Sequence, residues 1–256
     1  MKPRTALIVL AALMGLAGPA AADETTFCNF FITTLPYTIA TQGHYCFNQN
    51  LSTAITTGNA ITVNSDFVVI DLNNFKLGGG SAGLATNAIG IASVAHRNIT
   101  IRNGNIRGFK YGISLTGTGG GHLIENNLLD GNTYYGVRAN GDLVVIRNNI
   151  VTNTGGSTTT GNYWTYGIYA ATSGSGAITF VRDNVISNTF STNVAYGTYG
   201  IGARVTDHNL VKMGAHTAGN AVGMWANQCR DNTVLSNTSG NAFSCTQIGT
   251  NYTDTP

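Results

Sequence analysis

The densest group of titratable side chains in the sequence is Asp207, His208, Lys212 and His216. A carboxylate beside an imidazole is a residue pair that general acid–base catalysis uses, so Asp207 and His208 are the catalytic candidates. Adjacent residues of a strand, however, point to opposite faces of a sheet. The alternative is therefore that these four residues are ordinary surface or turn polar groups.

A second set of residues suits the binding of a sugar chain. Arg138, Tyr169, Arg204 and Trp225 occupy predicted outward positions in successive repeats. Aromatic rings stack on sugar rings, and a guanidinium can donate two parallel hydrogen bonds to a carboxylate. The alternative is a β-sheet surface with scattered aromatic residues. The inward neighbours that set this pattern are Ala139, Ala170, Ala203 and Ala226.

Two of the repeats are longer than the others, and their extra residues are 154–166 and 189–199. Insertions in a repeat protein commonly lie on its functional face. These segments carry Tyr163, Trp164 and Tyr196, which we add to the substrate-binding candidates. The alternative is a pair of loops without a ligand.

Two further columns receive structural interpretations. Tyr111, Tyr135, Tyr166 and Tyr199 each precede a repeated glycine. They lie two residues before a buried aliphatic position, so we expect an inward-facing or turn-lining aromatic stack. The second column is charged in each coil and predicts a charge ladder between coils. It comprises Arg102, Glu125, Arg147 and Arg182.

A repeat of 22 to 33 residues positions all of these side chains. It is marked by a glycine before an aliphatic residue, as at Gly112-Ile113, and by an asparagine before an aliphatic residue, as at Asn149-Ile150. Alternation by two after each glycine indicates strands, and this period indicates a solenoid. Neither a leucine-rich framework nor the longer period of a propeller blade is present. The sequence therefore predicts an all-β, right-handed parallel β-helix, a single-stranded solenoid of about eight coils.

The chain is expected to divide into a signal peptide at 1–22, an N-terminal cap at 23–60 and the β-helix domain at 61–256. Lys2 and Arg4 precede a short apolar run, and Ala20-Ala21-Ala22 form a small-residue cleavage site. We therefore expect a secreted or periplasmic protein. No later segment has the roughly 20 apolar residues of a membrane helix.

Cysteine and charge usage narrow the function classes. We expect two disulfides, one near each end of the rod, because cysteines pair in exported chains. The cysteines form two local pairs, Cys28 with Cys46 and Cys229 with Cys245. The net charge is only +2, and two of the basic residues lie in the expected signal peptide, so a nucleic-acid partner is not expected. No metal or cofactor motif is present, although a carboxylate pair could still bind Ca²⁺.

The chain resembles secreted bacterial right-handed β-helix repeat proteins of the pectate-lyase-like superfold. The likeness rests on Leu35-Pro36-Tyr37-Thr38-Ile39, Gly43-His44-Tyr45-Cys46, Val69-Ile70-Asp71-Leu72-Asn73 and Ile99-Thr100-Ile101-Arg102-Asn103-Gly104. The aspartate cluster and Gly-His-Gly element of polygalacturonases are missing, as is the Arg-x-Pro-x-x-Arg run of pectate lyases. The resemblance implies that the chain has this fold and is a member of the superfold whose activity is undefined.

Two functions follow as expectations. The first is an exported protein that binds or modifies an acidic polysaccharide, as a lyase, epimerase or hydrolase would. The second is a non-catalytic carbohydrate-binding or surface-structural β-helix. Whether the protein is an enzyme and how it oligomerises are left open by the sequence.

Overall fold

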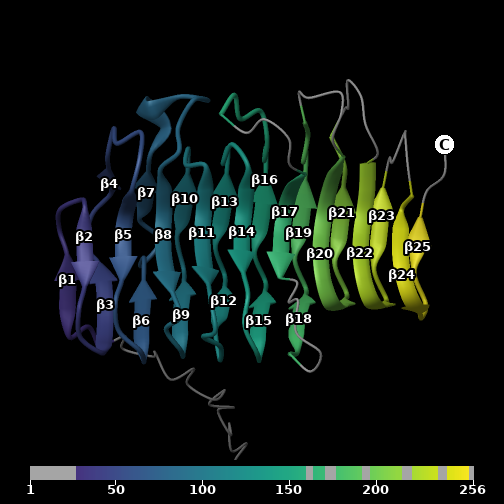
Figure 1. Cartoon of the computed structure of the whole chain (residues 1–256), viewed down its shortest axis with the longest axis horizontal. Helices are drawn as coiled ribbons and strands as arrows, with labels where there is room; N and C mark the ends of the chain where they lie inside the picture. The colour runs from purple at the N-terminus through teal and green to yellow at the C-terminus, as the bar shows by residue number, and fades with distance from the viewer. Residues whose placement is uncertain are drawn as a thin grey trace, which may run out of the picture.

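The computed structural model describes residues 27–159, 164–170, 177–191, 197–214, 221–235 and 241–253, apart from the side chain of residue 247. Within these ranges the chain winds into a parallel β-helix, which confirms the fold class (Figure 1). The strands in both sheets pair in parallel. The described residues contain no α-helix and one short 3₁₀ turn, Gly80–Ala82. None of their helices is long and apolar enough to cross a membrane.

Each early coil contributes three short strands. The first strands of the coils are β2 (Tyr37–Ile39), β5 (Asn59–Val63), β8 (Ile89–Val94), β11 (Tyr111–Thr116), β14 (Tyr135–Ala139) and β17 (Thr165–Ala170). The second strands are β3 (Gly43–Phe47), β6 (Val68–Asp71), β9 (Ile99–Arg102), β12 (Leu123–Glu125), β15 (Val144–Arg147) and β18 (Thr179–Arg182). β1 (Phe30–Ile32) pairs with β3 at the N-terminal end.

The third strands form a separate 9-stranded sheet. They are β4 (Leu51–Ser52), β7 (Lys76–Gly78), β10 (Asn105–Arg107), β13 (Leu128–Asp130), β16 (Ile150–Thr152), β19 (Val185–Ser187), β21 (Leu210–Lys212), β23 (Thr233–Leu235) and β25 (Tyr252–Thr253). The described residues therefore form nine coils, close to the expected number of about eight. The first of these coils includes Tyr37–Ile39 in the segment 23–60, which pairs in parallel with β5.

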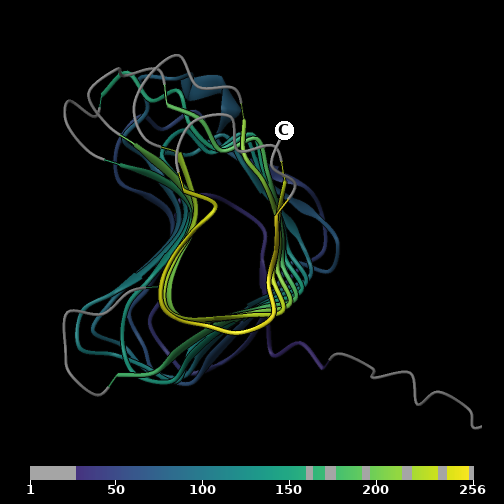
Figure 2. The ribbon, with the colours of Figure 1, turned by 90° about the vertical axis from the view of Figure 1, so that its right-hand side faces the viewer.

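The last three coils follow a shorter path. In each of these coils one long strand takes the place of the first strand, the loop and the second strand of an earlier coil. The long strands are β20 (Thr198–Asp207), β22 (Ala221–Arg230) and β24 (Phe243–Ile248). β20 accordingly pairs with β17 along its first half and with β18 along its second half. Viewed along the rod, the loops of the middle coils project beyond these long strands (Figure 2). The rod thus changes its cross-section between β18 and β20.

The core is built from inward residues that stack from coil to coil. Ile113, Val137, Ile168 and Ile201 are in register on adjacent strands and fully buried. The predicted alanine column, which ends at Ala226, is buried as well. Small side chains at the same level in each coil allow the neighbouring strands to pack a narrow interior without voids.

A ladder of buried asparagines closes the corner between the second and third strands. Each Nδ2 donates to the Oδ1 of the next coil, at 2.9–3.1 Å. The ladder comprises Asn127, Asn149, Asn184, Asn209, Asn232 and Asn251. The preceding residue in several coils has a left-handed backbone, with φ between 50° and 55° at Asn126, Asn148, Asp183, His208 and Asp231. The asparagines of the repeat therefore have a structural role: they bond to their equivalents in the adjacent coils at a left-handed turn.

Both predicted disulfides are present. Cys28 bonds to Cys46 beside β1 and β3, and Cys229 bonds to Cys245 between β22 and β24. The two bonds therefore fasten opposite ends of the rod. Disulfides of this kind are typical of proteins in an oxidising compartment.

Candidate ligand-binding face

The predicted outward column is present on the sheet formed by β14, β17, β20 and β22. Arg138 is in register with Tyr169, Tyr169 with Gly202, and Gly202 with Trp225. Trp225 is 43% exposed. Adjacent strands of a sheet lie about 4.8 Å apart, so one ligand chain running along the rod can contact several of these positions.

The tyrosine column lies on this same outer face, which differs from the inward-facing or turn-lining stack that we expected. Tyr111, Tyr135, Tyr166 and Tyr199 are in register from β11 to β20. Their ring centres are 5.3, 5.4 and 4.7 Å apart in that order. The rings therefore form one continuous row across four coils.

The glycine after each tyrosine explains the difference. A Cβ placed on Gly136 would lie 2.5 Å from the buried Val151 side chain, so this position faces the core. The next residue, Val137, is also fully buried. Two consecutive inward positions break the alternation, and Tyr135 is consequently outward although it lies two residues before a core residue.

Further rings join the tyrosine row. The ring of Tyr169 lies 4.8 Å from that of Tyr166, and the ring of Trp164 lies 5.2 Å from that of Tyr199. A Cβ on Gly202 would lie 2.8 Å from Tyr166 Cε1, so the glycine leaves the space that this ring occupies. We call the resulting surface the aromatic face. It comprises Tyr111, Tyr134, Tyr135, Trp164, Tyr166, Tyr169, Tyr199 and Trp225.

Two cations lie against rings of the aromatic face. Lys110 Nζ is 6.0 Å from the ring centre of Tyr134. Arg138 Cζ is 6.0 Å from the ring centre of Tyr111. Its Nε is buried and has no hydrogen-bond partner among the described residues. Burial raises the pKa of the Tyr135 and Tyr166 hydroxyls, which therefore stay protonated. The face thus combines ring surfaces, neutral hydroxyls and a guanidinium with an unsatisfied donor.

The remaining binding candidates are placed differently. Arg204 lies two residues beyond Gly202 on β20 and lines a separate recess with Phe180 and Val205. Trp164 is 47% exposed at the edge of the aromatic face. Tyr163 and Tyr196 lie outside the described residues, so their role in substrate binding stays a prediction.

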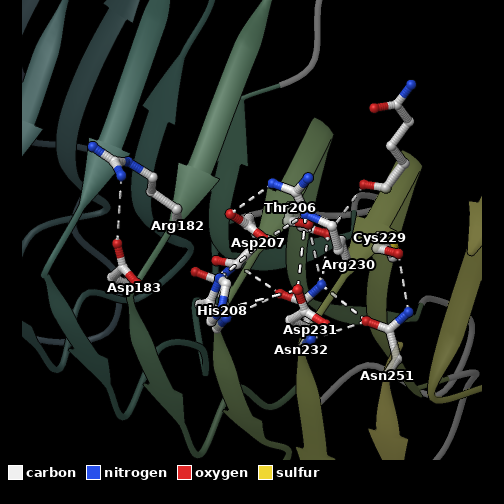
Figure 3. A network of polar contacts seen from close by, with 12 residues as sticks. Arg182, Asp183, Thr206, Asp207, His208, Cys229, Arg230, Asp231, Asn232 and Asn251 are labelled. Carbon is white, nitrogen blue, oxygen red and sulfur yellow. Dashed lines mark hydrogen bonds and ion pairs between the residues drawn. The ribbon is translucent and has the colours of Figure 1, made fainter. Parts of the chain in front are cut away.

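The catalytic candidates Asp207 and His208 are in contact (Figure 3). His208 Nδ1 is 3.1 Å from Asp207 Oδ1. The two side chains meet because His208 has φ 51° at a turn and does not continue the strand. Arg230 donates to both carboxylate oxygens, at 3.0 and 3.1 Å, and lowers the pKa of Asp207. Asp207 is therefore an ionised group that orients His208 and Arg230.

Of the other two titratable residues near this pair, Lys212 ends β21 and is exposed, and His216 lies outside the described residues. Asp207, His208 and Asp231 offer ligand atoms that lie within 4.8 Å of one another. Arg230, however, already occupies both oxygens of Asp207. A bound cation would share this carboxylate with the Arg230 guanidinium, and the repulsion between the two positive charges disfavours a resident metal here.

The predicted charge ladder lies along the same corner of the rod and is largely paired. Arg102 Nε is 2.8 Å from Asp71, and Arg147 Nη2 is 2.7 Å from Glu125. Arg182 follows Arg147 in register but is next to Asp207, whose oxygens are taken by Arg230. Within the predicted column the Glu125–Arg147 pair is confirmed, whereas Arg102 pairs with Asp71 outside the column and Arg182 lies at a break in the ladder.

Comparison of the chain with protein-family models, with curated proteins and with solved structures finds no match.

Proposed function

We propose that the protein is an exported β-helix of the pectate-lyase-like superfold that binds an extended, acidic polysaccharide along the aromatic face. The observation that carries the proposal is the row of rings on consecutive coils with Arg138 among them. The coil spacing of about 4.8 Å approximates the length of a sugar unit. Tyr166 is only 5% exposed and stacks on Tyr199, so the tyrosine row forms the floor of the face. Sugar units can stack on the rings that stay exposed, Trp164 at 47% and Trp225 at 43%.

Arg138 supports an acidic ligand. Its buried Nε lacks a partner, and a buried donor without an acceptor is costly. A carboxylate on the sugar would satisfy the guanidinium with charge-assisted hydrogen bonds. The two disulfides and the expected signal peptide at residues 1–22 support export, where such polymers are found.

Tryptophan fluorescence tests this proposal directly, because the chain has two tryptophans and both lie on the aromatic face. Titration with polygalacturonate or alginate should shift or quench the emission in a saturable way. Replacing Tyr169 and Trp225 by alanine should weaken binding by about 1–2 kcal/mol per aromatic side chain. The matched control is Tyr252→Ala, which removes a 61% exposed tyrosine on β25, in the other sheet.

Thermal unfolding separates binding from folding in these variants. If the folded double variant binds as tightly as the unaltered protein, the aromatic face is not the binding site. If it loses stability but keeps its affinity per folded molecule, the rings serve packing and the proposal is wrong.

Modification of the bound polymer is the second candidate function, and the contact between Asp207 and His208 favours it. An imidazole held by a carboxylate can act as a general base. Incubation with polyuronates should then release ultraviolet-absorbing unsaturated ends or new reducing ends, and His208→Ala should abolish the release. A pure binding protein would release neither product.

A further inference from the structure

The rod has a step where its cross-section changes, and a groove follows the step. Ile178 and Phe180 flank it from β18 and the residues before it, while Arg204 and Val205 flank it from β20. This recess has a volume of about 370 Å³. A second hollow of about 340 Å³ shares Phe180 and Val205 and continues to Arg182. We call the two together the step groove.

The step groove exists because β20 has no loop between its two halves. β17 and β18 are separated by residues 171–178, whereas β20 runs from Thr198 to Asp207 without interruption. The backbone N–H of Arg204 donates to Thr179 Oγ1 at 3.0 Å, which holds β20 against β18 at this point. Phe180 therefore stays 39% exposed and Ile178 41% exposed at the edge of the shorter coil.

The groove also has an excess of positive charge. Its charged lining residues are Arg182, Arg204, Asp207 and Arg230. Asp207 is bonded to Arg230 through both oxygens. The carboxylate nearest to Arg182 is Asp183, at 3.9 Å, and Figure 3 shows this pair apart from the Asp207–Arg230 pair. A contact of that length is beyond hydrogen-bonding distance, so the Arg182 guanidinium can still donate hydrogen bonds to an anionic ligand.

Phe180 and Arg182 are two residues apart on β18 and both are exposed, so their side chains leave the same face of the strand. The pair combines an apolar ring with a cation on one wall. An inorganic anion would use the arginine alone. A six-membered sugar ring that carries a carboxylate would use both, with stacking on Phe180 and a charge-assisted hydrogen bond to Arg182.

We infer that the step groove is a subsite for one uronic acid residue of the bound glycan. The inference rests on the proposed function for the kind of ligand, and adds the place where its charge is recognised. β20 and β22 each run from the aromatic face into the groove, through Gly202 and Arg204 on β20 and through Trp225 and Asn227 on β22. A ligand that extends along these strands as well as across them can therefore contact both sites.

The test is calorimetric titration of the full chain with the dimer of galacturonic acid and with its methyl ester, which keeps the shape and loses the charge. We expect Arg182→Gln to weaken binding of the acid dimer roughly tenfold, the size of one charge-assisted hydrogen bond. The ester should bind weakly to both proteins. Phe180→Ala should weaken both ligands. The matched control is Arg107→Gln, which removes a 52% exposed arginine on β10.

The outcomes separate the groove from the aromatic face. Dimer binding that survives in the Tyr169→Ala and Trp225→Ala double variant, and is lost in Arg182→Gln, supports the groove even if polymer binding by the aromatic face fails. Equal affinity of Arg182→Gln and the unaltered protein overturns the groove. Absence of dimer binding by the unaltered protein also overturns it, and leaves the polymer titration to decide the aromatic face.

Discussion

The asparagine ladder allows the sharpest stability prediction, because one side chain serves three coils. Asn184 Oδ1 accepts from the backbone N and from Nδ2 of Asn149, both at 3.0 Å. Its Nδ2 donates to Ile146 O, to Arg182 O and to Asn209 Oδ1, at 3.0, 2.8 and 3.0 Å. Asn184 is 1% exposed. Asn184→Ala removes these hydrogen bonds, and the alanine side chain has no polar atom to replace them.

The expected cost follows from the groups left behind. The backbone N–H of Asn149 loses its acceptor inside the protein, which costs about 1–3 kcal/mol. Asn209 Oδ1 still accepts from the backbone N of Asn184, so it loses only part of its bonding. The remaining lost hydrogen bonds contribute about 0.5–1.5 kcal/mol each. We therefore expect Asn184→Ala to lower the free energy of unfolding by at least about 3 kcal/mol.

Urea unfolding followed by far-ultraviolet circular dichroism measures this loss. The matched control is Asn188→Gly, four residues away in the same coil. Asn188 is exposed and bonds to Asn153 Oδ1 at 2.8 Å, and glycine accepts its φ of 54°. The control should cost about 1 kcal/mol or less. Equal midpoints and slopes for the two variants would refute the view that the ladder holds adjacent coils together.

Three further predictions concern other parts of the rod. His122 is buried and accepts from Ile99 N, and burial lowers its pKa from 6.5 to about 4. The stability that neutral His122 contributes is fully present above pH 6.5 and is lost as the pH falls to 4, a loss of about 3 kcal/mol. The free energy of unfolding should therefore change less with pH in His122→Gln than in the unaltered protein. Replacing Cys229 and Cys245 by alanine opens a link over 16 residues and should cost about 3 kcal/mol, with faster amide exchange confined to β22–β25. Gly202→Ala should displace Tyr166 and weaken glycan binding with a small change in melting temperature, and unchanged affinity would contradict that packing.

Much of the fold could be predicted because each coil of the solenoid has the same residue types at the same positions. Small residues such as Ala203 recur at an inward position, and asparagines such as Asn209 recur at one corner, so each coil supports the interpretation of the others. The first coil was missed because Tyr37–Ile39 lies outside the glycine series. This strand pairs with β5, and no local sequence pattern predicts that pairing.

The candidate site was predicted in part, and the misses share one physical cause. The outward column through Tyr169 and Trp225 follows strict alternation and was found. In both of the missed places the alternation of inward and outward residues fails. At Gly136 two consecutive residues face inward, which moves Tyr135 to the outer face, and at His208 a left-handed turn brings the imidazole onto Asp207.

The step groove could not be predicted from the pattern of the repeat. Arg204 was recognised from its outward position, but Phe180 and Arg182 belong to the preceding coil and lie beside it only because β20 takes the shorter path. The length of chain between landmarks indicates that a loop is present or missing. It does not indicate which side chains the missing loop uncovers. In a solenoid, ligand sites of this type arise where neighbouring coils differ, whereas the repeat that reveals the fold describes only what the coils share.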